Sequence, residues 1–255
     1  MQDFRGLSRQ VWHQRYLAQA EWTAHIRQYL FKKINPPCNE RILEIGSGTS
    51  AVLQALHKEG FVSLSGIDLD QPSLSYAKTS GETFRLAQAD GMCLPFVDGS
   101  FGITFCHFLL MWVRNPLQIL EEMVRVTRNK GWVISLAEPD HHARIDYPPP
   151  LDELGYHQTQ ALGSQGVDVT MGRKLRSLFQ QAGLVDVEVG MLGALWDDNV
   201  SHSPGETEWI MIQTDLADDL SAEKLLEYRN LDHHAYQNKT RILFIPTFYA
   251  LGRPT

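Results

Sequence analysis

The segment at residues 41–50, Arg-Ile-Leu-Glu-Ile-Gly-Ser-Gly-Thr-Ser, constrains the fold of this chain more than any other. An apolar strand there ends in a carboxylate, Glu44, and passes through two glycines into the start of a helix. Gly46 and Gly48 can adopt positive φ and bring bare backbone close to a ligand, while the helix start offers unpaired N–H groups. We therefore expect a ligand-binding turn made of Gly46, Ser47, Gly48 and Thr49.

The carboxylate of Glu44 bears on which ligand the turn accepts. An acid two residues before the first glycine would repel the pyrophosphate that dinucleotide-binding turns hold. It would attract S-adenosylmethionine, whose methionine part carries an ammonium and a sulfonium. The run Gly46-x-Gly48-x-x-Ala51 nevertheless fits the relaxed dinucleotide pattern, so a nicotinamide cofactor remains an alternative.

Two further predicted strands lead to acidic residues. Residues 61–68 read as a strand that ends in Asp68, 20 positions after Gly48, where a ribose partner is expected with either cofactor. Leu69 follows directly. Residues 83–89 read as a third strand, which leads to Asp90, Gly91 and Met92.

Together with the run Leu94-Pro95-Phe96, these strand ends resemble the class I S-adenosylmethionine-dependent methyltransferases, in the branch of small-molecule and quinone-type enzymes. The resemblance covers residues 41–193. It implies that Asp90 accepts a hydrogen bond from the adenine amino group and that the backbone at Gly91 and Met92 closes over the ring. Two positions depart from the family pattern: Ser50 replaces a frequent glycine and Gly102 replaces the usual aspartate.

The predicted fold is α/β: a Rossmann-like, doubly wound, mostly parallel seven-stranded sheet with an antiparallel C-terminal hairpin. We expect one domain over residues 1–255. It comprises an N-terminal helical flap (1–40), a cofactor-binding core (41–138) and acceptor-side insertions (139–169 and 196–240). A last strand is expected at 241–252, with Pro246 at a bulge or an edge.

The N-terminal flap reads as helical over residues 7–33 and is expected to cover the methionine end of the cofactor. The ring face of Tyr16 or Trp22 can contact the sulfonium, since aromatic faces attract cations. Arg27 can pair with the methionine carboxylate. Packing and surface exposure are the alternative explanations for these three residues.

Methyl transfer needs alignment and exclusion of water, and a base only when the acceptor must lose a proton. The candidates are His107, at the end of the fourth strand, and His142, after the fifth. The resemblance places His107 near the methionine and the methyl group. Either histidine can instead be an orienting residue. No metal is expected, because the acids and histidines at 138–142 are neighbours in one loop and rarely point at one ion.

The acceptor is expected to be a small molecule bound by the two insertions, which act as a lid or simply pack on the sheet. A net charge of -7 argues against nucleic acid as the acceptor. No apolar run of membrane-spanning length and no secretory signal is visible, so the expected location is the cytoplasm. The expected product of the cofactor is S-adenosylhomocysteine. The oligomeric state is open. Candidate residues for the acceptor pocket are Tyr147, His157, Trp196 and Tyr249.

Two other functions compete with a methyltransferase. A nicotinamide-dependent oxidoreductase conflicts with Glu44, and the Tyr-x-x-x-Lys of Tyr29 and Lys33 precedes the glycine turn instead of following the later strands. A non-catalytic protein that keeps the fold and binds the cofactor would preserve the same three acids.

Overall fold

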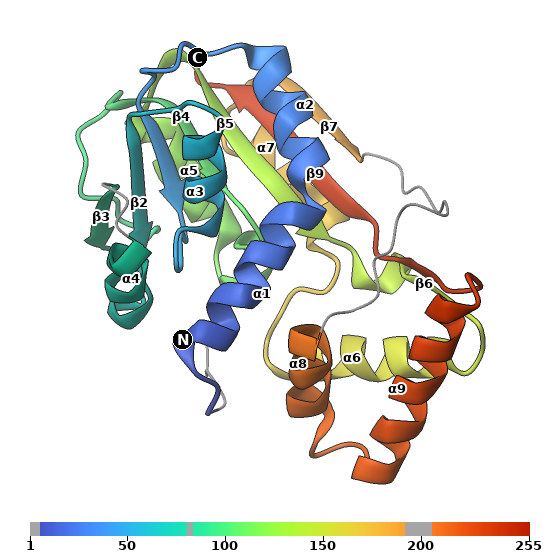
Figure 1. The fold of residues 1–255 in the computed structure, drawn as a ribbon. Coiled ribbons are helices and arrows are strands. Elements are labelled where there is room, and N and C mark those ends of the chain that lie inside the picture. The colour runs from blue at the N-terminus through green and yellow to red at the C-terminus, as the bar shows by residue number, and fades with distance from the viewer. Residues whose placement is uncertain (1–5, 81–83, 192–205) are drawn as a thin grey trace. The chain divides into compact units, whose positions relative to one another are not determined.

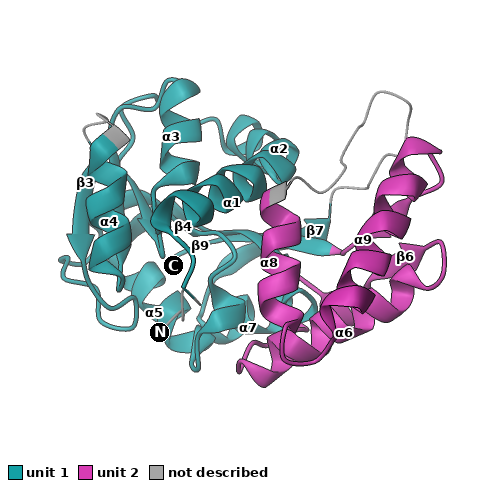
Figure 2. Cartoon of the chain, turned by 60° about the horizontal axis from the view of Figure 1, so that its bottom comes forward, with its two compact units in different colours: residues 1–138, 171–192, 247–255 teal, residues 139–170, 193–246 magenta. Residues whose placement is uncertain are grey.

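The computed structural model describes residues 6–80, 84–191 and 206–255 (Figure 1). The chain divides into two compact units (Figure 2). The core unit comprises residues 1–138, 171–192 and 247–255, and the second unit comprises residues 139–170 and 193–246. The second unit overlaps the segments at 139–169 and 196–240, whose role as acceptor-side insertions stays a prediction.

The core unit contains a seven-stranded sheet in the order β3-β2-β1-β4-β5-β9-β7. Strands β1 to β5 pair in parallel, whereas β7 and β9 are antiparallel to each other. This arrangement confirms the predicted α/β fold and its C-terminal antiparallel pair. The strands are β1 (Ile42–Ile45), β2 (Leu64–Asp68), β3 (Arg85–Gln88), β4 (Phe101–Cys106), β5 (Thr127–Pro139), β7 (Val185–Met191) and β9 (Thr247–Arg253).

Helices cover both faces of this sheet (Figure 1). Helices α2 (Ala24–Ile34) and α3 (Ala51–Lys58) share an apolar cluster with residues of β1, β4, β5 and β9, and α1 (Arg9–Trp22) packs on α3. Helix α5 (Pro116–Val126) packs on β4 and against α7 (Met171–Gln181), which packs on β7 and β9. The short α4 (Gln71–Ala77) and η1 (Lys78–Ser80) connect β2 to β3, and η2 (Leu110–Trp112) precedes α5.

Local sequence explains several helix starts. The side chain of Asn115 accepts a hydrogen bond from the N–H of Gln118 at 3.2 Å, and Pro116 begins α5. Asp70 caps α4 in the same way through the N–H of Ser73 at 2.9 Å. Both are side-chain caps followed by a proline in the first turn, where the missing N–H is harmless.

Two expectations about the course of the backbone were wrong. The predicted helix over residues 7–33 is broken at Thr23 into α1 and α2. The predicted strand at 241–252 is split before Pro246 into β8 (Ile242–Phe244), which belongs to the second unit, and β9. Proline lacks the N–H that a continuous strand would use, and its carbonyl accepts from the N–H of Asp140 at 2.8 Å.

Gly102, which departs from the family pattern, lies against the side chain of Glu40. A Cβ atom at Gly102 would overlap the Glu40 carboxylate. That carboxylate accepts hydrogen bonds from the backbone N–H of Arg41 and from the guanidinium of Arg128. A carboxylate from the preceding segment thus occupies the space beside the start of β4.

The second unit joins its two segments by strand pairing and by buried charges. Strand β6 (Ile145–Tyr147) pairs antiparallel with β8, and helix α6 (Leu151–Ser164) packs on α8 (Glu206–Leu216) and α9 (Ala222–Gln237). The short η3 (His141–Ala143) precedes β6. Arg241 is 2% exposed in its side chain and pairs with Asp232 at 2.7 Å and Asp146 at 2.6 Å. Asp146 also pairs with Arg144, so two arginines and two aspartates compensate one another in the interior.

Candidate functional site

The glycine turn after β1 is anchored on the neighbouring strand. The N–H groups of Gly46 and Ser47 both donate to the carbonyl of Ile67 in β2, each at 2.9 Å. Gly46 has φ +74° and Gly48 has φ +49°, as the sequence predicted for both. Ser50 also adopts a left-handed φ of +64°, a conformation that glycine adopts with less strain. The turn therefore exposes bare backbone at the carboxyl end of β1.

Asp68, at the end of β2, fixes the second side of this turn. Its Oδ2 accepts from the N–H of Gly48 at 2.7 Å, and its Oδ1 accepts from the N–H of Asp70 at 2.8 Å. Burial raises the pKa of Asp68, and the two backbone N–H groups lower it again. Leu69 is 62% exposed, and its carbonyl accepts from the side-chain amide of Gln88 at 2.9 Å.

Glu44 is the unusual carboxylate of the site. It is only 2% exposed, and its Oε2 atom has no hydrogen-bond partner among the described residues. Burial raises the pKa of Glu44 well above its ordinary value, and the nearby charge of Asp68 raises it further, whereas Arg27 lowers it. A buried acceptor without a donor is costly, so the site fits a ligand that supplies a cationic donor.

The loop after β3 presents backbone as well. The Oδ1 atom of Asp90 accepts from the N–H of Met92 at 2.9 Å, and the Met92 carbonyl accepts from the side-chain amide of Gln118 at 3.0 Å. A Cβ atom at Gly91 would lie 2.8 Å from Ile119 Cδ1 and 2.9 Å from Ile45 Cγ2. Glycine is therefore required where this loop packs against β1 and α5.

Helix α1 lies against the glycine turn. A Cβ atom at Gly48 would lie 3.2 Å from the ring of Tyr16, and His13 Nδ1 forms a 2.8 Å hydrogen bond with Thr49 Oγ1. Arg9 pairs with Asp70 at 3.4 Å. Arg9 and His13 were not predicted from the sequence, although their spacing to Tyr16 puts all three residues on one helical face. Burial and the charge of Asp68 raise the pKa of Tyr16.

His107 follows β4 and is tied to the break between α1 and α2. Its Nε2 atom lies 2.8 Å from Thr23 Oγ1. Burial, followed by the positive charge of Arg27, lowers the pKa of His107 to about 3. The imidazole is therefore neutral at physiological pH, and its environment favours an orienting role over that of a base.

Comparison with known proteins agrees with this geometry. Residues 43–135, which include the glycine turn and Asp68, match the family described as a methyltransferase domain. The segment that carries the glycine turn therefore resembles a methyltransferase domain in sequence.

Two curated methyltransferases are similar to this chain over about two thirds of its length. The chain is 28% identical over 185 residues to an uncharacterized methyltransferase of Schizosaccharomyces pombe, covering 66% of the chain and 64% of that protein. It is 26% identical over 190 residues to the demethylmenaquinone methyltransferase of Geobacillus kaustophilus, covering 64% of the chain and 78% of that enzyme.

One solved structure shows the shared fold. Haemonchus contortus phosphoethanolamine N-methyltransferase 2, in complex with S-adenosyl-L-methionine, superposes with a TM-score of 0.59 at 14% identity. The match covers 94% of this chain and 57% of that one. The fold of this chain is therefore similar to the fold of that solved structure over most of its length.

Two flap residues predicted to contact cofactor have definite surroundings in the core unit. Arg27 is buried; its Nε donates to Glu59 Oε1 at 3.0 Å, and its Nη1 donates to the carbonyl of Ala20 at 2.9 Å. Trp22 is 50% exposed. The contact of either residue with a cofactor stays a prediction, and Arg27 has at least two structural partners that its sequence position did not reveal.

The candidates for acceptor binding are dispersed. His142, Tyr147 and His157 belong to the second unit, where His142 is exposed in η3 and Tyr147 is 53% exposed. Tyr249 belongs to the core unit, is 6% exposed and packs in the apolar cluster under α2 and α3. Trp196 lies outside the described residues.

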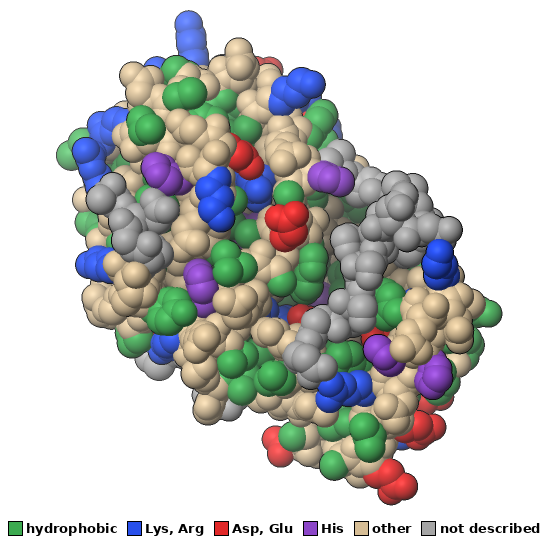
Figure 3. Space-filling model, viewed as in Figure 1, with side chains coloured by type: hydrophobic (Ala, Val, Ile, Leu, Met, Phe, Trp, Pro, Cys, Tyr) green, Lys and Arg blue, Asp and Glu red, His purple; other side chains and the backbone are tan. Residues whose placement is uncertain are grey.

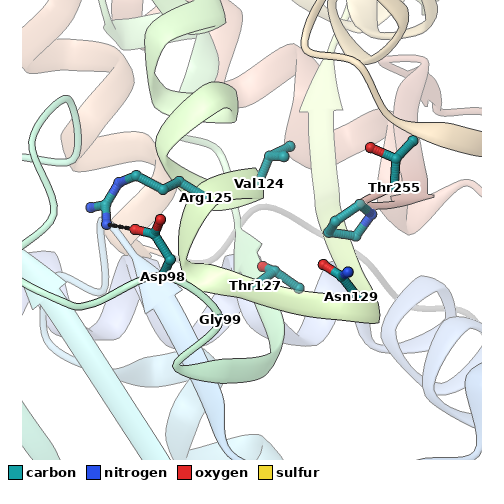
Figure 4. Close-up of a pocket in the computed structure, with 8 residues that line it drawn as sticks. Asp98, Gly99, Val124, Arg125, Thr127, Asn129 and Thr255 are labelled. Atoms are coloured by element: carbon teal, nitrogen blue, oxygen red, sulfur yellow. Dashed lines mark hydrogen bonds and ion pairs between the residues drawn. The ribbon is translucent and has the colours of Figure 1, made fainter.

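A surface cavity of about 410 Å³ lies near the amino ends of β4 and β5 (Figure 4), whereas the glycine turn follows the carboxyl end of β1. Its lining residues include Asp98, Arg125, Thr127 and Asn129, around the amino ends of β4 and β5. The Arg125 guanidinium is already bonded to Glu122, to Asp98 and to two backbone carbonyls. This cavity is therefore separate from the glycine turn, and its main charged groups pair with one another.

Three observations on the described residues concern metal sites, membrane-spanning helices and surfaces for polyanionic ligands. Among the described residues, no group of three or more His, Cys, Asp or Glu is placed to hold a metal ion. No helix within the same residues is long and apolar enough to cross a membrane. On the face shown in Figure 3, basic side chains are dispersed among other residues instead of forming a broad basic surface.

Proposed function

We propose that this protein transfers the methyl group of S-adenosylmethionine to a small-molecule acceptor by in-line displacement. The observation that carries the proposal is the buried Oε2 atom of Glu44, which lacks a partner in the described chain and lies two residues before Gly46, in the segment that matches a methyltransferase domain. When bound, S-adenosylmethionine supplies a methyl group activated by a positively charged sulfur. A cation at this position would compensate the Glu44 carboxylate.

The roles of the other residues follow from their places around the turn. The backbone of Gly46, Ser47, Gly48 and Thr49 would receive the ligand, while Asp68, with Leu69, would hold the ribose hydroxyls. Tyr16 would cover the turn from α1 and help to exclude water. Asp90, Gly91 and Met92 would enclose the adenine.

We propose that the second unit provides the acceptor side through the segments at 139–169 and 196–240. The Geobacillus relative is named for demethylmenaquinone, and the Haemonchus enzyme for phosphoethanolamine. A partly apolar small molecule of quinone type is the acceptor class that we favour, since the curated relative named for it is more similar in sequence. His142 would face this acceptor, and His107 would orient groups at the end of β4.

Calorimetric titration tests the cofactor assignment directly. S-adenosylmethionine, S-adenosylhomocysteine and NADH would be titrated into the wild-type protein, the Glu44→Ala variant and a Glu121→Ala control. Glu121 is an exposed carboxylate on α5, so its loss changes the net charge equally without touching the turn. We expect the first two ligands to bind wild type and control and to lose at least about tenfold in affinity with Glu44→Ala.

Binding of NADH alone would overturn the methyltransferase proposal in favour of an oxidoreductase. Transfer itself is tested by supplying S-adenosylmethionine with panels of quinols, phenols and amines and measuring the S-adenosylhomocysteine formed. Cofactor binding with no product from any panel would indicate a non-catalytic protein of the same fold.

A further inference from the structure

Thr23 occupies the junction between α1 and α2. Its N–H and its hydroxyl both lie within hydrogen-bond distance of the Gln19 carbonyl, at 3.2 and 2.9 Å. A second carbonyl, that of Ala20, lies 3.5 Å from the hydroxyl. A threonine hydroxyl that bonds to the carbonyl one turn earlier bends or ends a helix, which accounts for the break at this residue.

The position of one proton on His107 follows from these contacts. Backbone carbonyls only accept, so the hydroxyl proton of Thr23 is donated to Gln19. The remaining interaction of Thr23 Oγ1, at 2.8 Å from His107 Nε2, then requires a proton on the imidazole nitrogen. If Thr23 donated to His107 instead, its oxygen would face the Gln19 carbonyl oxygen at 2.9 Å with no proton between them. The contacts therefore select the Nε2–H tautomer.

A neutral Nε2–H imidazole has an unprotonated Nδ1, which can only accept. Within the described chain, Nδ1 of His107 has no hydrogen-bond partner, and the only hydrogen bond of this ring is the one to Thr23. The lone pair of Nδ1 points away from the Nε2–H bond and so away from Thr23. Low basicity of the buried ring keeps it in this neutral form.

The segment that carries His107 is held on its other side by Glu138, at the end of β5. Glu138 Oε1 accepts from the N–H groups of Leu109 at 3.0 Å and Leu110 at 2.7 Å, and Oε2 accepts from Met111 at 3.2 Å. The N–H of Phe108 donates to the carbonyl of Ala137 at 2.9 Å. The hydrogen bond to Thr23 and the backbone hydrogen bonds to Ala137 and Glu138 thus together fix the orientation of the His107 ring.

This ring lies beside the glycine turn. Cys106 pairs with Ile45 in the register of β4 and β1, so His107 and Gly46 follow the ends of adjacent parallel strands. The positive charge of Arg27 lowers the pKa of both His107 and Glu44, so its electrostatic influence reaches both side chains. Two acceptors without partners in the described chain, Nδ1 of His107 and Oε2 of Glu44, thus belong to residues near the carboxyl ends of the adjacent strands β4 and β1.

We propose that Thr23 is a positioning residue that holds His107 as the Nε2–H tautomer, so that Nδ1 accepts a hydrogen bond from the ammonium group of the bound ligand. The ligand part of this inference rests on the proposed function. The tautomer part concerns the protein alone and is measurable without ligand. Because an ammonium has several N–H donors, it can satisfy Nδ1 and Glu44 together.

The test combines NMR with ligand binding. Long-range ¹H–¹⁵N spectra of ¹⁵N-histidine-labelled protein distinguish the two tautomers, with the His107 signals assigned from a His107→Asn sample. Thr23→Val removes the hydroxyl and keeps the side-chain shape, whereas Thr23→Ser keeps the hydroxyl. Thr159→Val is the matched control, since Thr159 also bonds to the carbonyl one turn earlier in a buried helix, at 2.9 Å from Gly155.

We expect a protonated Nε2 and an unprotonated Nδ1 in the wild type, Thr23→Ser and Thr159→Val, and loss of this pattern in Thr23→Val. Thr23→Val should weaken S-adenosylhomocysteine about tenfold, and Thr23→Ser by less than about threefold. A deamino analogue of the same ligand should bind the wild type and Thr23→Val equally. Circular dichroism and thermal unfolding check that each variant is folded.

A protonated Nδ1 in the wild type, or an unchanged tautomer in folded Thr23→Val, would overturn the proposal. Equal weakening of the ligand and its deamino analogue would overturn the ammonium contact. If S-adenosylhomocysteine fails to bind the wild type while the Nε2–H pattern is present, the proposed function fails and the tautomer assignment stands.

Discussion

The carboxylate of Asp68 accepts a hydrogen bond from the backbone N–H of Gly48 at 2.7 Å, although Asp68 ends β2 and Gly48 lies after β1. Its second oxygen accepts from the N–H of Asp70 at 2.8 Å. The two bonds fix the acid against the glycine turn before any ligand arrives. Preorganisation of this kind reduces the entropy lost on binding.

Two substitutions of Asp68 should weaken cofactor binding to different extents. Asp68→Asn keeps one oxygen that can accept from Gly48 but loses the charge, and we expect S-adenosylmethionine affinity to fall about tenfold. Asp68→Ala removes both bonds, and we expect about a hundredfold loss. Calorimetry measures the affinity of both variants. Asp98→Asn, near the amino end of β4, is the control. Unchanged affinity in Asp68→Ala would remove this residue from the site.

Glu44 should make the ligand-free protein less stable as pH rises. Burial raises its folded-state pKa above the ordinary 4.5, so the folded state holds the proton more tightly than the unfolded state. The stability linked to this proton is complete below about pH 4.5 and is lost as pH rises through the folded-state pKa. Glu44→Gln cannot ionise and avoids that loss.

We therefore expect ligand-free Glu44→Gln to be more stable than the wild type at pH 7.5, by roughly 1–3 kcal/mol, with the difference closing towards pH 4.5. Saturating S-adenosylmethionine should reverse the order. Thermal unfolding from pH 4.5 to 8 measures both effects. A stability difference that is independent of pH would show that ionisation of Glu44 does not destabilise the folded state.

The residues at the strand ends were predictable because local sequence determines them. An apolar run followed by a polar residue located Glu44, Asp68 and Asp90, and glycine spacing located the turn. The cap at Asn115 was equally local, since it depends on a side chain and an N–H three residues apart. Each of these features depends on residues that lie within a few positions of one another in the sequence.

Contacts between distant segments were not predictable. Thr23 and His107 are 84 positions apart, and the sequence around either one gives no sign of the other. The same holds for Arg27, whose partner Glu59 is 32 positions away. Helix α6 also went unpredicted, because its apolar residues are interrupted by glycines and are buried against helices from a separate segment. Tertiary packing decided these features.

Gly46 should resist substitution more than a glycine with similar backbone angles elsewhere. Gly46→Ala combines φ +74° with a Cβ only 2.8 Å from Leu109 Cδ1, whereas Gly183 has φ +78° and no heavy atom within 4 Å of its would-be Cβ. We expect Gly183→Ala to lower the unfolding free energy by about 1–2 kcal/mol and Gly46→Ala by about 1–3 kcal/mol more. Urea unfolding of both variants gives the difference. Equal losses would mean that Leu109 moves aside without cost.

Glu138 should be a strong determinant of the segment after β4. Its carboxylate accepts from three consecutive N–H groups, those of Leu109, Leu110 and Met111, and it is fully buried. In Glu138→Gln, one oxygen becomes an NH₂ group that faces at least one of these donors. We expect a loss of about 2–4 kcal/mol in unfolding free energy, with faster amide exchange at residues 109–111. Glu121→Gln, at an exposed position on α5, should change neither quantity. If the three amides stay as protected in Glu138→Gln as in the wild type, the carboxylate is not what holds His107 in place.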